Sequence, residues 1–332
     1  MTVTVGIAGL GLIGKERLLA MEKLQGRGRD IEVAGVFDPY ADSSLGGDYR
    51  VETLPALLSS QPDLVVVATP HSSALEVATA ALSSGSDVLV EKPLGRSAAE
   101  TTEFAEMSAL TGRSVHVGFN YRFFPGVRAL LADLDRQAFG DLINVRMTLG
   151  HGGSPGDEKT WKLDGEHAGG GCLIDPGIHL IDLAQQIGGE CAVSSTNTWS
   201  GFWGTGIEEQ AHVVLEARSV PMIDLDISIV RWRSTFRLEV NGTEGYGLVE
   251  GRGRSYGPQT YRTGRRWGWK DGGTQAESER VVLSSDCSDS FADELEDLLF
   301  GPSESGGVCT LAQARSGMDT LESCRMHAGI SR

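Results

Sequence analysis

Cysteine is scarce in this sequence of 332 residues, and the few cysteines form no pattern. They are odd in number, scattered along the chain, and never spaced as C-x-x-C. A disulfide framework or a thiolate metal site would need paired or closely spaced cysteines. The sequence therefore predicts a cytoplasmic protein with reduced thiols, at Cys172, Cys191, Cys287, Cys309 and Cys324.

Long apolar runs and positive charge are lacking as well. No segment approaches the ~20 apolar residues of a membrane span, and the opening MTVTVGIAGLG lacks the charged and long apolar regions of a signal peptide. The chain has 29 Lys and Arg against 45 Asp and Glu, which gives a net charge of −16. Nucleic-acid and anionic membrane surfaces need an excess of basic residues. We therefore expect neither a nucleic-acid nor a membrane partner.

The chain is long enough for two domains, because it is 40% hydrophobic and single cores stop growing near ~250 residues. In residues 1–120, apolar β-branched runs alternate with segments of helix length. Runs that are apolar at nearly every position fit strands buried on both faces, joined by right-handed crossovers into a parallel sheet. This half predicts an α/β, doubly wound Rossmann domain, from the runs VTVGIA, IEVAGVF, DLVVVA, DVLVE and SVHVGF.

In residues 121–332, strand patterns follow one another across short turns, and helical patterns occur only near residues 172–187 and 290–328. This order predicts an α+β domain with a large open, mostly antiparallel sheet. The strands are LINVRMTLG, AHVVLEA, MIDLDISIV, STFRLEVNG and YGLVEG. Because so few helices cannot cover both faces of the sheet, we expect a homodimer or homotetramer that pairs through the open face.

The motif GLGLIG places Gly9, Gly11 and Gly14 between the first strand and the first helix, with Leu12 and Ile13 among them. Such glycines allow a tight turn and a close approach to a pyrophosphate, which the free N–H groups of the helix can bind. The second strand ends at Asp38, near the spacing expected of a carboxylate that accepts from the ribose hydroxyls. A glycine-rich turn and a helix-capping Asp are the alternatives.

Asp38 also predicts a preference for NAD over NADP, because a carboxylate repels a 2′-phosphate. The next residues, Pro39 and Tyr40, supply no Arg to receive that phosphate, although Lys15 or Arg17 could reach it.

Ligands of open parallel sheets bind beyond the carboxyl ends of the strands. A Lys at such an end can stabilise negative charge on a substrate oxygen. Lys92 occupies this position. The alternative interpretation is that Lys92 is an ordinary solvated lysine paired with Glu91. Arg122 either faces the cleft or is solvated. We expect the cofactor to contact Thr69, Pro70, His71, Glu91 and Lys92, and the substrate to contact Lys92, Asn120, Tyr121 and Arg122.

The segment GGGCLIDPGIHLIDL, residues 169–183, sets Asp175 and His179 four residues apart, which places them on one face of a helix. Asp175 before Pro176 also fits a purely structural helix N-cap. His titrates near neutrality, so His179 suits a general base that works with Lys92 and Asp175 on substrate. A metal site is the third reading, but no ligand spacing supports one from Asp175, His179, His167 and Cys172.

Together, GLGLIG, EKP, GFNYRFFP, GGGCLIDPGIHLIDL and RLEVNGTEG resemble the glucose-fructose oxidoreductase and inositol dehydrogenase (Gfo/Idh/MocA) family over essentially the whole chain. The resemblance implies a Rossmann domain, a second domain whose open sheet serves oligomerisation, NAD or NADP as cofactor, and a sugar or other polyol as substrate. It also implies that Lys92, Asp175 and His179 are the catalytic residues. The sequence departs from the family at Ala74, where members commonly have His, with His71 nearby instead.

The expected function is therefore an NAD(P)-dependent oxidoreductase that moves a hydride between the nicotinamide and a secondary hydroxyl or ketone of a sugar, cyclitol or sugar derivative. His179 would be the base, Lys92 would stabilise the alkoxide, and Asp175 would bind a hydroxyl or orient the imidazole. A non-catalytic dinucleotide sensor and an NAD-using glycosidase or eliminase are the alternatives. The basic, aromatic stretch 252–273 is either an exposed hairpin or a rim that attracts a phosphorylated or nucleotide-linked sugar.

Overall fold

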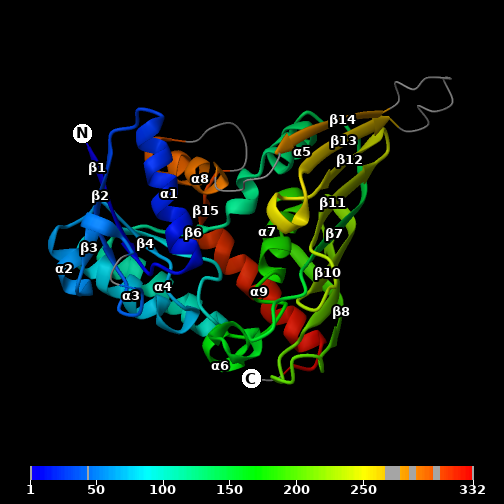
Figure 1. Ribbon diagram of the computed structural model, residues 1–332. Coiled ribbons are helices and arrows are strands. Elements are labelled where there is room, and N and C mark those ends of the chain that lie inside the picture. Colours follow the sequence, from blue (N-terminus) through cyan, green and yellow to red (C-terminus); the bar gives the residue numbers. More distant parts are fainter. Residues whose placement is uncertain (1, 43–44, 266–276, 284–288, 302–306, 331–332) are drawn as a thin grey trace.

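Two sheets with helices between them make up the computed structural model (Figure 1). It describes residues 2–42, 45–265, 277–283, 289–301 and 307–330. Cys287 and residues 266–273 of the basic stretch lie outside these ranges. Among the described residues, no helix is both long and apolar enough to cross a membrane.

The first sheet has seven strands in the order β15-β6-β5-β4-β1-β2-β3, and all pairs are parallel except β15 with β6. This confirms the predicted Rossmann-type sheet. The strands are β1 (Val3–Ala8), β2 (Ile31–Phe37), β3 (Arg50–Val51), β4 (Leu64–Val67), β5 (Asp87–Glu91), β6 (Val115–Gly118) and β15 (Cys309–Thr310). The helices are α1 (Leu12–Gly26), α2 (Leu54–Ser59), α3 (His71–Ser83), α4 (Ala98–Thr111) and α8 (Asp289–Phe300).

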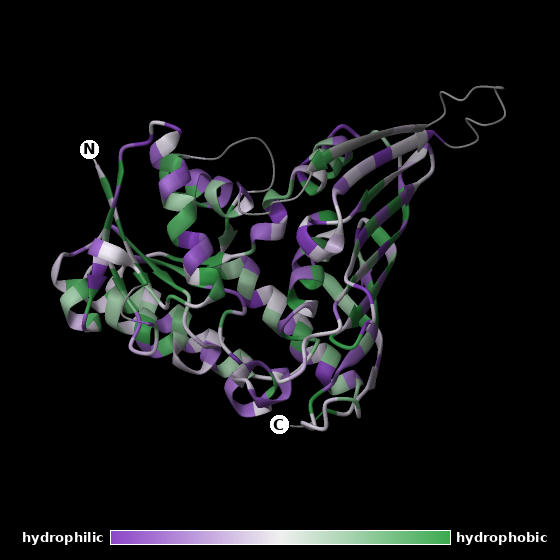
Figure 2. Ribbon diagram, viewed as in Figure 1, coloured by the Kyte–Doolittle hydropathy of each residue, from purple (hydrophilic) through white to green (hydrophobic). Residues whose placement is uncertain are grey.

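Helices cover both faces of this sheet, and side chains of one strand alternate between them. Val66 of β4 belongs to the apolar cluster formed with α1 and α8, whereas its neighbours Val65 and Val67 belong to the cluster formed with α3 and α4. All four residues of β4 are buried, and all four are apolar (Figure 2). Burial on both faces is why these strands carry an unbroken apolar pattern.

The second sheet has eight strands in the order β14-β13-β12-β11-β7-β10-β9-β8, and only β10 and β7 pair in parallel. The mostly antiparallel sheet is therefore confirmed. Its strands are β7 (Leu142–Gly150), β8 (Cys191–Trp199), β9 (Gln210–Ala217), β10 (Val220–Ser228), β11 (Thr235–Gly242), β12 (Gly245–Glu250), β13 (Gln259–Arg265) and β14 (Glu277–Leu283). The helices of this half are α5 (Pro125–Asp135), α6 (Gly165–Ala168), α7 (Gly177–Gly188) and α9 (Leu311–His327).

Helices α5, α7 and α9 lie on one face of the second sheet, toward the first domain (Figure 1). The opposite face has no helix over it in this view, and several charged side chains of the sheet form ion pairs (Figure 1). Asp224 lies 3.7 Å from Arg146 and 3.8 Å from His212, and Arg237 forms an ion pair with Glu250 at 2.8 Å. Many apolar residues of these strands are buried, but Ile143, Trp199 and Met222 are exposed, so the second sheet bears ion pairs together with some uncovered apolar side chains.

The C-terminal part of the chain returns to the first domain. Helix α8 packs against α1, and β15 pairs with β6 to form one edge of the first sheet (Figure 1). A single boundary near residue 120, with domains of 1–120 and 121–332, therefore leaves out a segment that completes the first sheet. Short 3₁₀ helices lie in the connections between strands and helices of the described chain, at Gly47–Tyr49, Asn120–Phe123, Asp157–Lys159, Trp161–Leu163 and Arg254–Tyr256.

Candidate active site

The glycine turn after β1 has the geometry of a dinucleotide-binding loop. Gly9 has φ +96°, and a Cβ there would lie 2.4 Å from the carbonyl oxygen of Ala68. A Cβ on Gly14 would lie 1.9 Å from the carbonyl oxygen of Gly9, so the helix can pack closely only without it. A Cβ on Gly11 would meet nothing within 4 Å, and no side chain caps α1. The open space at Gly11 and the uncapped helix fit a pyrophosphate.

Asp38 follows β2 and ties two loops together. Its Oδ2 accepts from the backbone N–H of Leu10 at 2.6 Å, and its Oδ1 accepts from Tyr40 at 2.8 Å and Ala41 at 3.0 Å. The carboxylate is therefore fixed beside the glycine turn rather than capping a helix. Lys15 and Arg17 are the two cations that could reach a 2′-phosphate. Lys15 is exposed, whereas Arg17 is fully buried.

Arg17 forms a buried cluster with two carboxylates. Its Nε donates to Glu91 at 2.6 Å, and its Nη2 donates to Glu294 of α8 at 2.6 Å. Burial raises the pKa of Glu294 to about 7, against the pull of the Arg17 charge. Glu91 is thus bound to Arg17 and not to Lys92, which removes the simple reading of Lys92 as a lysine paired with its neighbour.

Lys92, at the carboxyl end of β5, contacts Asp175 of the second domain. Its Nζ donates to Oδ1 of Asp175 at 2.5 Å and to the backbone carbonyl of Asp175 at 3.1 Å. Burial raises the pKa of Asp175, but the charge of Lys92, and then that of Lys162, outweighs it and holds the pKa well below its usual range. Asp175 is therefore an ionised partner of Lys92.

The N-cap reading of Asp175 is wrong. Helix α7 begins at Gly177, Pro176 occupies the N-cap position, and no side chain caps the helix. The glycines before it serve close packing of the chain, since a Cβ on Gly171 would lie 1.9 Å from the carbonyl oxygen of Glu208.

His179 lies in the first turn of α7 and is 6% exposed. Burial lowers its pKa well below 6.5; the charges of Lys92 and Arg252 lower it further, while Asp175 opposes them. Its Nδ1 is buried without a hydrogen-bond partner among the described residues, so Asp175 does not orient the imidazole through this atom. The remaining nitrogen, Nε2, is the one left to meet a ligand.

Tyr121 holds the imidazole of His179 by stacking. The two ring centroids are 3.9 Å apart and the planes differ by 9°, and Phe119 contacts the same imidazole edge-on at 5.8 Å. Tyr121, in the segment that follows β6, therefore lies directly against His179.

The neighbours of Tyr121 point elsewhere. Arg122 is 1% exposed, and its guanidinium donates to both carboxylate oxygens of Asp182, at 2.9 and 2.6 Å. Asn120 donates to the hydroxyl of Ser290 in α8 at 3.0 Å. The structure thus gives Arg122 and Asn120 buried contacts between chain segments and does not bring them to Lys92 and His179.

His71, at the start of α3 after Thr69 and Pro70, also reaches the second domain. Its Nδ1 is 2.7 Å from the carbonyl oxygen of Ala168, and Trp161 contacts the ring edge-on at 4.8 Å. Burial, together with the charge of Lys92, lowers the pKa of His71 to about 4. The ring is therefore neutral and donates from Nδ1. The hydroxyl of Thr69 is buried with no partner among the described residues.

Sequence reasoning missed His151, Lys162 and the position of Arg252. Burial lowers the pKa of His151, and smaller influences come from Asp175, Arg252, Lys162 and Asp157, so these charged groups lie in the neighbourhood of His151. His151 directly follows β7, and Arg252 follows β12 by two residues.

The metal reading gains no geometric support. His167 is exposed and lies 3.3 Å from Asp164, while Cys172 is fully buried beneath Glu208. Across the part of the chain that the structure describes, no three His, Cys, Asp or Glu side chains are placed to hold a metal ion.

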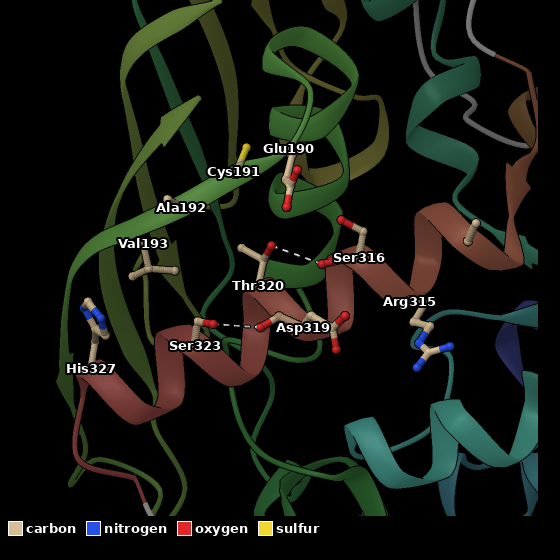
Figure 3. A pocket seen from close by; sticks show the side chains of 11 residues that line it. Glu190, Cys191, Ala192, Val193, Arg315, Ser316, Asp319, Thr320, Ser323 and His327 are labelled. Atoms are coloured by element: carbon tan, nitrogen blue, oxygen red, sulfur yellow. Dashed lines mark hydrogen bonds between the residues drawn. The ribbon is translucent and has the colours of Figure 1, made fainter. Parts of the chain in front are cut away.

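An open groove of about 590 Å³ lies between β8 and α9 (Figure 3). None of the predicted site residues lines it. The hydroxyls of Thr320 and Ser323 donate to the carbonyls of Ser316 and Asp319 one turn earlier, at 3.1 and 3.0 Å (Figure 3). These two hydroxyls therefore already donate to carbonyls within their own helix.

Comparison with known proteins decides the family. Residues 3–119 match the model of the Gfo/Idh/MocA oxidoreductase family with its NAD-binding Rossmann fold, and residues 127–246 match a Gfo/Idh/MocA C-terminal domain. The chain belongs to the Gfo/Idh/MocA family. The resemblance drawn from the motifs is thereby confirmed, and with it the assignment to NAD-binding oxidoreductases.

The individual relatives share only a modest fraction of identical residues with this chain. The chain is 28% identical to inositol 2-dehydrogenase of Rhizobium meliloti over 257 residues, 74% of each chain. It is 35% identical to levoglucosan dehydrogenase of Pseudarthrobacter phenanthrenivorans over 148 residues, 43% of this chain and 37% of the relative. A solved levoglucosan dehydrogenase, in complex with NADH and levoglucosan, matches with a TM-score of 0.85 over 99% of this chain and 97% of its own, at 17% identity. The last match shows the shared fold.

Proposed function

We propose that this Gfo/Idh/MocA protein transfers a hydride between NAD and a secondary hydroxyl group of a sugar, cyclitol or related polyhydroxylated compound, with the ketone as the other partner. Relatives named as inositol and levoglucosan dehydrogenases support the substrate class. The single observation that carries the chemistry is the contact of Lys92 with Asp175 beside the buried His179. It joins the end of β5, where a cofactor would lie, to the segment of the second domain just before α7.

The cofactor would be held by the first domain. The N-terminus of α1 and the turn from Gly9 to Gly14 suit the pyrophosphate, and Asp38 suits the ribose next to the adenine. When bound, the nicotinamide supplies the acceptor for the hydride. We propose NAD as the preferred form, because Asp38 would repel a 2′-phosphate and Arg17 is buried with Glu91 and Glu294.

Each site residue then has a distinct task. Within the described part of the chain, Asp175 takes two of the three N–H donors of the Lys92 ammonium, which leaves the third for the reacting oxygen of the substrate. That hydrogen bond stabilises the negative charge that develops on the oxygen. The hydroxyl proton moves to Nε2 of His179, which is neutral because its pKa is lowered. In the reverse direction, the protonated imidazole returns the proton.

Two variants test this assignment. We expect Lys92→Met and His179→Ala to lower turnover by roughly 100-fold or more with little change in NADH affinity. Lys23→Met is a matched control, because Lys23 also pairs with an aspartate, Asp289 at 2.9 Å, and lies in the last turn of α1, at the end opposite the glycine turn. Turnover is followed by the absorbance of reduced nicotinamide with sugars and cyclitols, and parent-like rates in both site variants would refute the catalytic assignment.

The alternatives are less well supported. A dinucleotide sensor would have no use for Lys92 and His179 beside each other, and the relatives are named dehydrogenases. An NAD-using glycosidase or eliminase would show no net change of reduced nicotinamide, so the same assay separates it.

We also propose a homo-oligomer that pairs through the ion-paired open face of the second sheet. Light scattering that gives the monomer mass of 35.4 kDa at micromolar concentration would contradict it.

A further inference from the structure

The segment that follows β6, residues 119–123, holds helix α7 at two points. Tyr121 stacks on His179 in the first turn of α7, with ring centroids 3.9 Å apart. Arg122, the next residue, forms an ion pair with Asp182 on the same helix. Because Asp182 follows His179 by three residues, the two contacts lie about one turn apart on one face of the helix. Together they fix both the position and the rotation of α7 relative to the end of β6.

The contact between Arg122 and Asp182 is directional. Nε and Nη2 of Arg122 donate to Oδ2 and Oδ1 of the carboxylate at 2.9 and 2.6 Å, so two parallel hydrogen bonds set the distance and the angle between the groups. The side chains are 1% and 5% exposed. Burial of two charges removes solvation that their attraction returns only in part. Such a pair is therefore better suited to fixing a geometry than to adding stability.

The other side of the same guanidinium is bound to the chain that completes the first sheet. Nη1 of Arg122 donates to the carbonyl oxygen of Gly307 at 3.0 Å and to Oε1 of Gln313 at 3.2 Å. These two residues flank β15, which pairs with β6. Arg122 is therefore held at the edge of the first sheet, and its remaining N–H groups hold Asp182 from there.

The position of α7 matters because the proposed reacting groups come from both domains. Lys92 follows β5, and β5 pairs with β6 in the first sheet. His179 lies on α7, which packs on the face of the second sheet that is turned toward the first domain (Figure 1). A displacement of about 1 Å between reacting groups can cost roughly 100-fold in rate. The placement of the imidazole beside Lys92 therefore depends on what joins the end of β6 to α7.

We propose that Arg122 is a positioning residue of this enzyme: through Asp182 it sets the rotation of α7 and thereby the place of the His179 imidazole beside Lys92. This inference rests on the proposed function, because it takes His179 as the base. Arg122 acts on the reaction through α7 and not by contact with the substrate.

Two conservative variants change the geometry of this pair and keep its charges. Arg122→Lys replaces the forked contact with a point charge, and Asp182→Glu moves the carboxylate by one methylene group. We expect each variant to lower kcat for oxidation by about tenfold or more, with little change in NADH affinity. In the background of His179→Ala, neither change should lower kcat by more than about twofold further, because the base that the pair positions is gone.

A spectroscopic measurement reads the imidazole without turnover. The chain has seven histidines, and a proton-carbon correlation spectrum of histidine-labelled protein gives a ring signal for each. The His179 signal is identified by its absence in His179→Ala, and the stacked ring of Tyr121 displaces it from its ordinary position. We expect this signal to shift in both variants, while that of His212, beside Asp224 on the open face, stays in place.

The matched control is Arg237→Lys, because Arg237 also contacts two carboxylates, Glu239 and Glu250, but does so on the open face of the second sheet. It should behave as the parent does in both measurements. Thermal melting shows whether each variant is folded, and Asp182→Glu serves if Arg122→Lys is not.

The outcomes separate this inference from the proposed function. A His179 signal that stays in place, or a loss of kcat that persists in full in the His179→Ala background, would overturn the role of Arg122. A parent protein without turnover on any sugar or cyclitol would count against the proposed function, and the His179 signal would still decide whether Arg122 positions the imidazole.

Discussion

Replacing Asp175 by asparagine tests whether its carboxylate and Lys92 act as one unit. Asparagine keeps the size of the side chain but removes the charge that Lys92 contacts. A hydrogen bond to a charged group contributes ~1.5–3 kcal/mol, and 1.36 kcal/mol corresponds to about tenfold in rate. If this bond holds Lys92 in place in the transition state, kcat/KM should fall by roughly 10- to 150-fold.

The fold should tolerate the change. The two side chains are 17% and 28% exposed, so the ion pair contributes about 1 kcal/mol or less to the free energy of unfolding. Asp224→Asn is the matched control, since Asp224 is also in an ion pair, is 23% exposed and lies on the open face of the second sheet. It should leave turnover unchanged, as measured by the absorbance of reduced nicotinamide.

A double-mutant cycle with Lys92→Met completes the test. Groups that act as a unit show non-additive losses, so the double variant should be no more than a few-fold slower than Lys92→Met alone. Losses that multiply would show that Asp175 and Lys92 act independently. Full activity in Asp175→Asn would refute the reasoning outright.

Three further predictions concern the cofactor and pH. Gly11→Ala should keep the parent melting temperature but weaken NADH binding about tenfold or more. Gly14→Ala should unfold at a lower temperature, because its Cβ would lie 1.9 Å from a carbonyl oxygen. Equal melting temperatures of the two variants would contradict this prediction. Asp38→Asn removes the charge that would repel the 2′-phosphate of NADPH. It should therefore lower the ratio of the NADPH dissociation constant to the NADH dissociation constant about tenfold or more, and an unchanged ratio would contradict this prediction. Burial lowers the pKa of His179 well below 6.5, so its base form persists as pH falls. The kcat/KM for oxidation should stay level down to pH 6.5 and be lost only below it; a loss centred above about pH 7 would show that another group is the base.

The fold could be predicted wherever burial imposes a simple pattern. The central strands of the first sheet are apolar because helices cover both faces, and strands such as β11 alternate because one face is buried. β8, with the sequence CAVSSTNTW, was missed because it is an edge strand with little apolar alternation. β3 and β15 have two residues each, too few to form a pattern.

The site could be predicted where the chemistry sits in short motifs. Lys92 and His179 follow from the ends of strands and the family resemblance, whereas the partner of Arg122, Asp182, lies 60 residues away and leaves no local signal. Arg252 lies over the ring of Tyr121 only because β12 and the loop after it are placed by the register of the second sheet. Such long-range contacts depend on the whole fold rather than on local sequence.

The return of α8 to the first domain has a consequence for biosynthesis. Glu294 contacts the buried Arg17 from a position 277 residues later in the chain. At about 5–20 residues per second, the ribosome needs roughly 14 to 55 s to make that stretch. Until then the nascent Rossmann sheet lacks its edge strand β15, and Arg17 has Glu91 but not its second carboxylate. The nucleotide-binding half can therefore be completed only at the end of translation, and a chaperone that shields the emerging chain would have to cover the α1 face for all of that time.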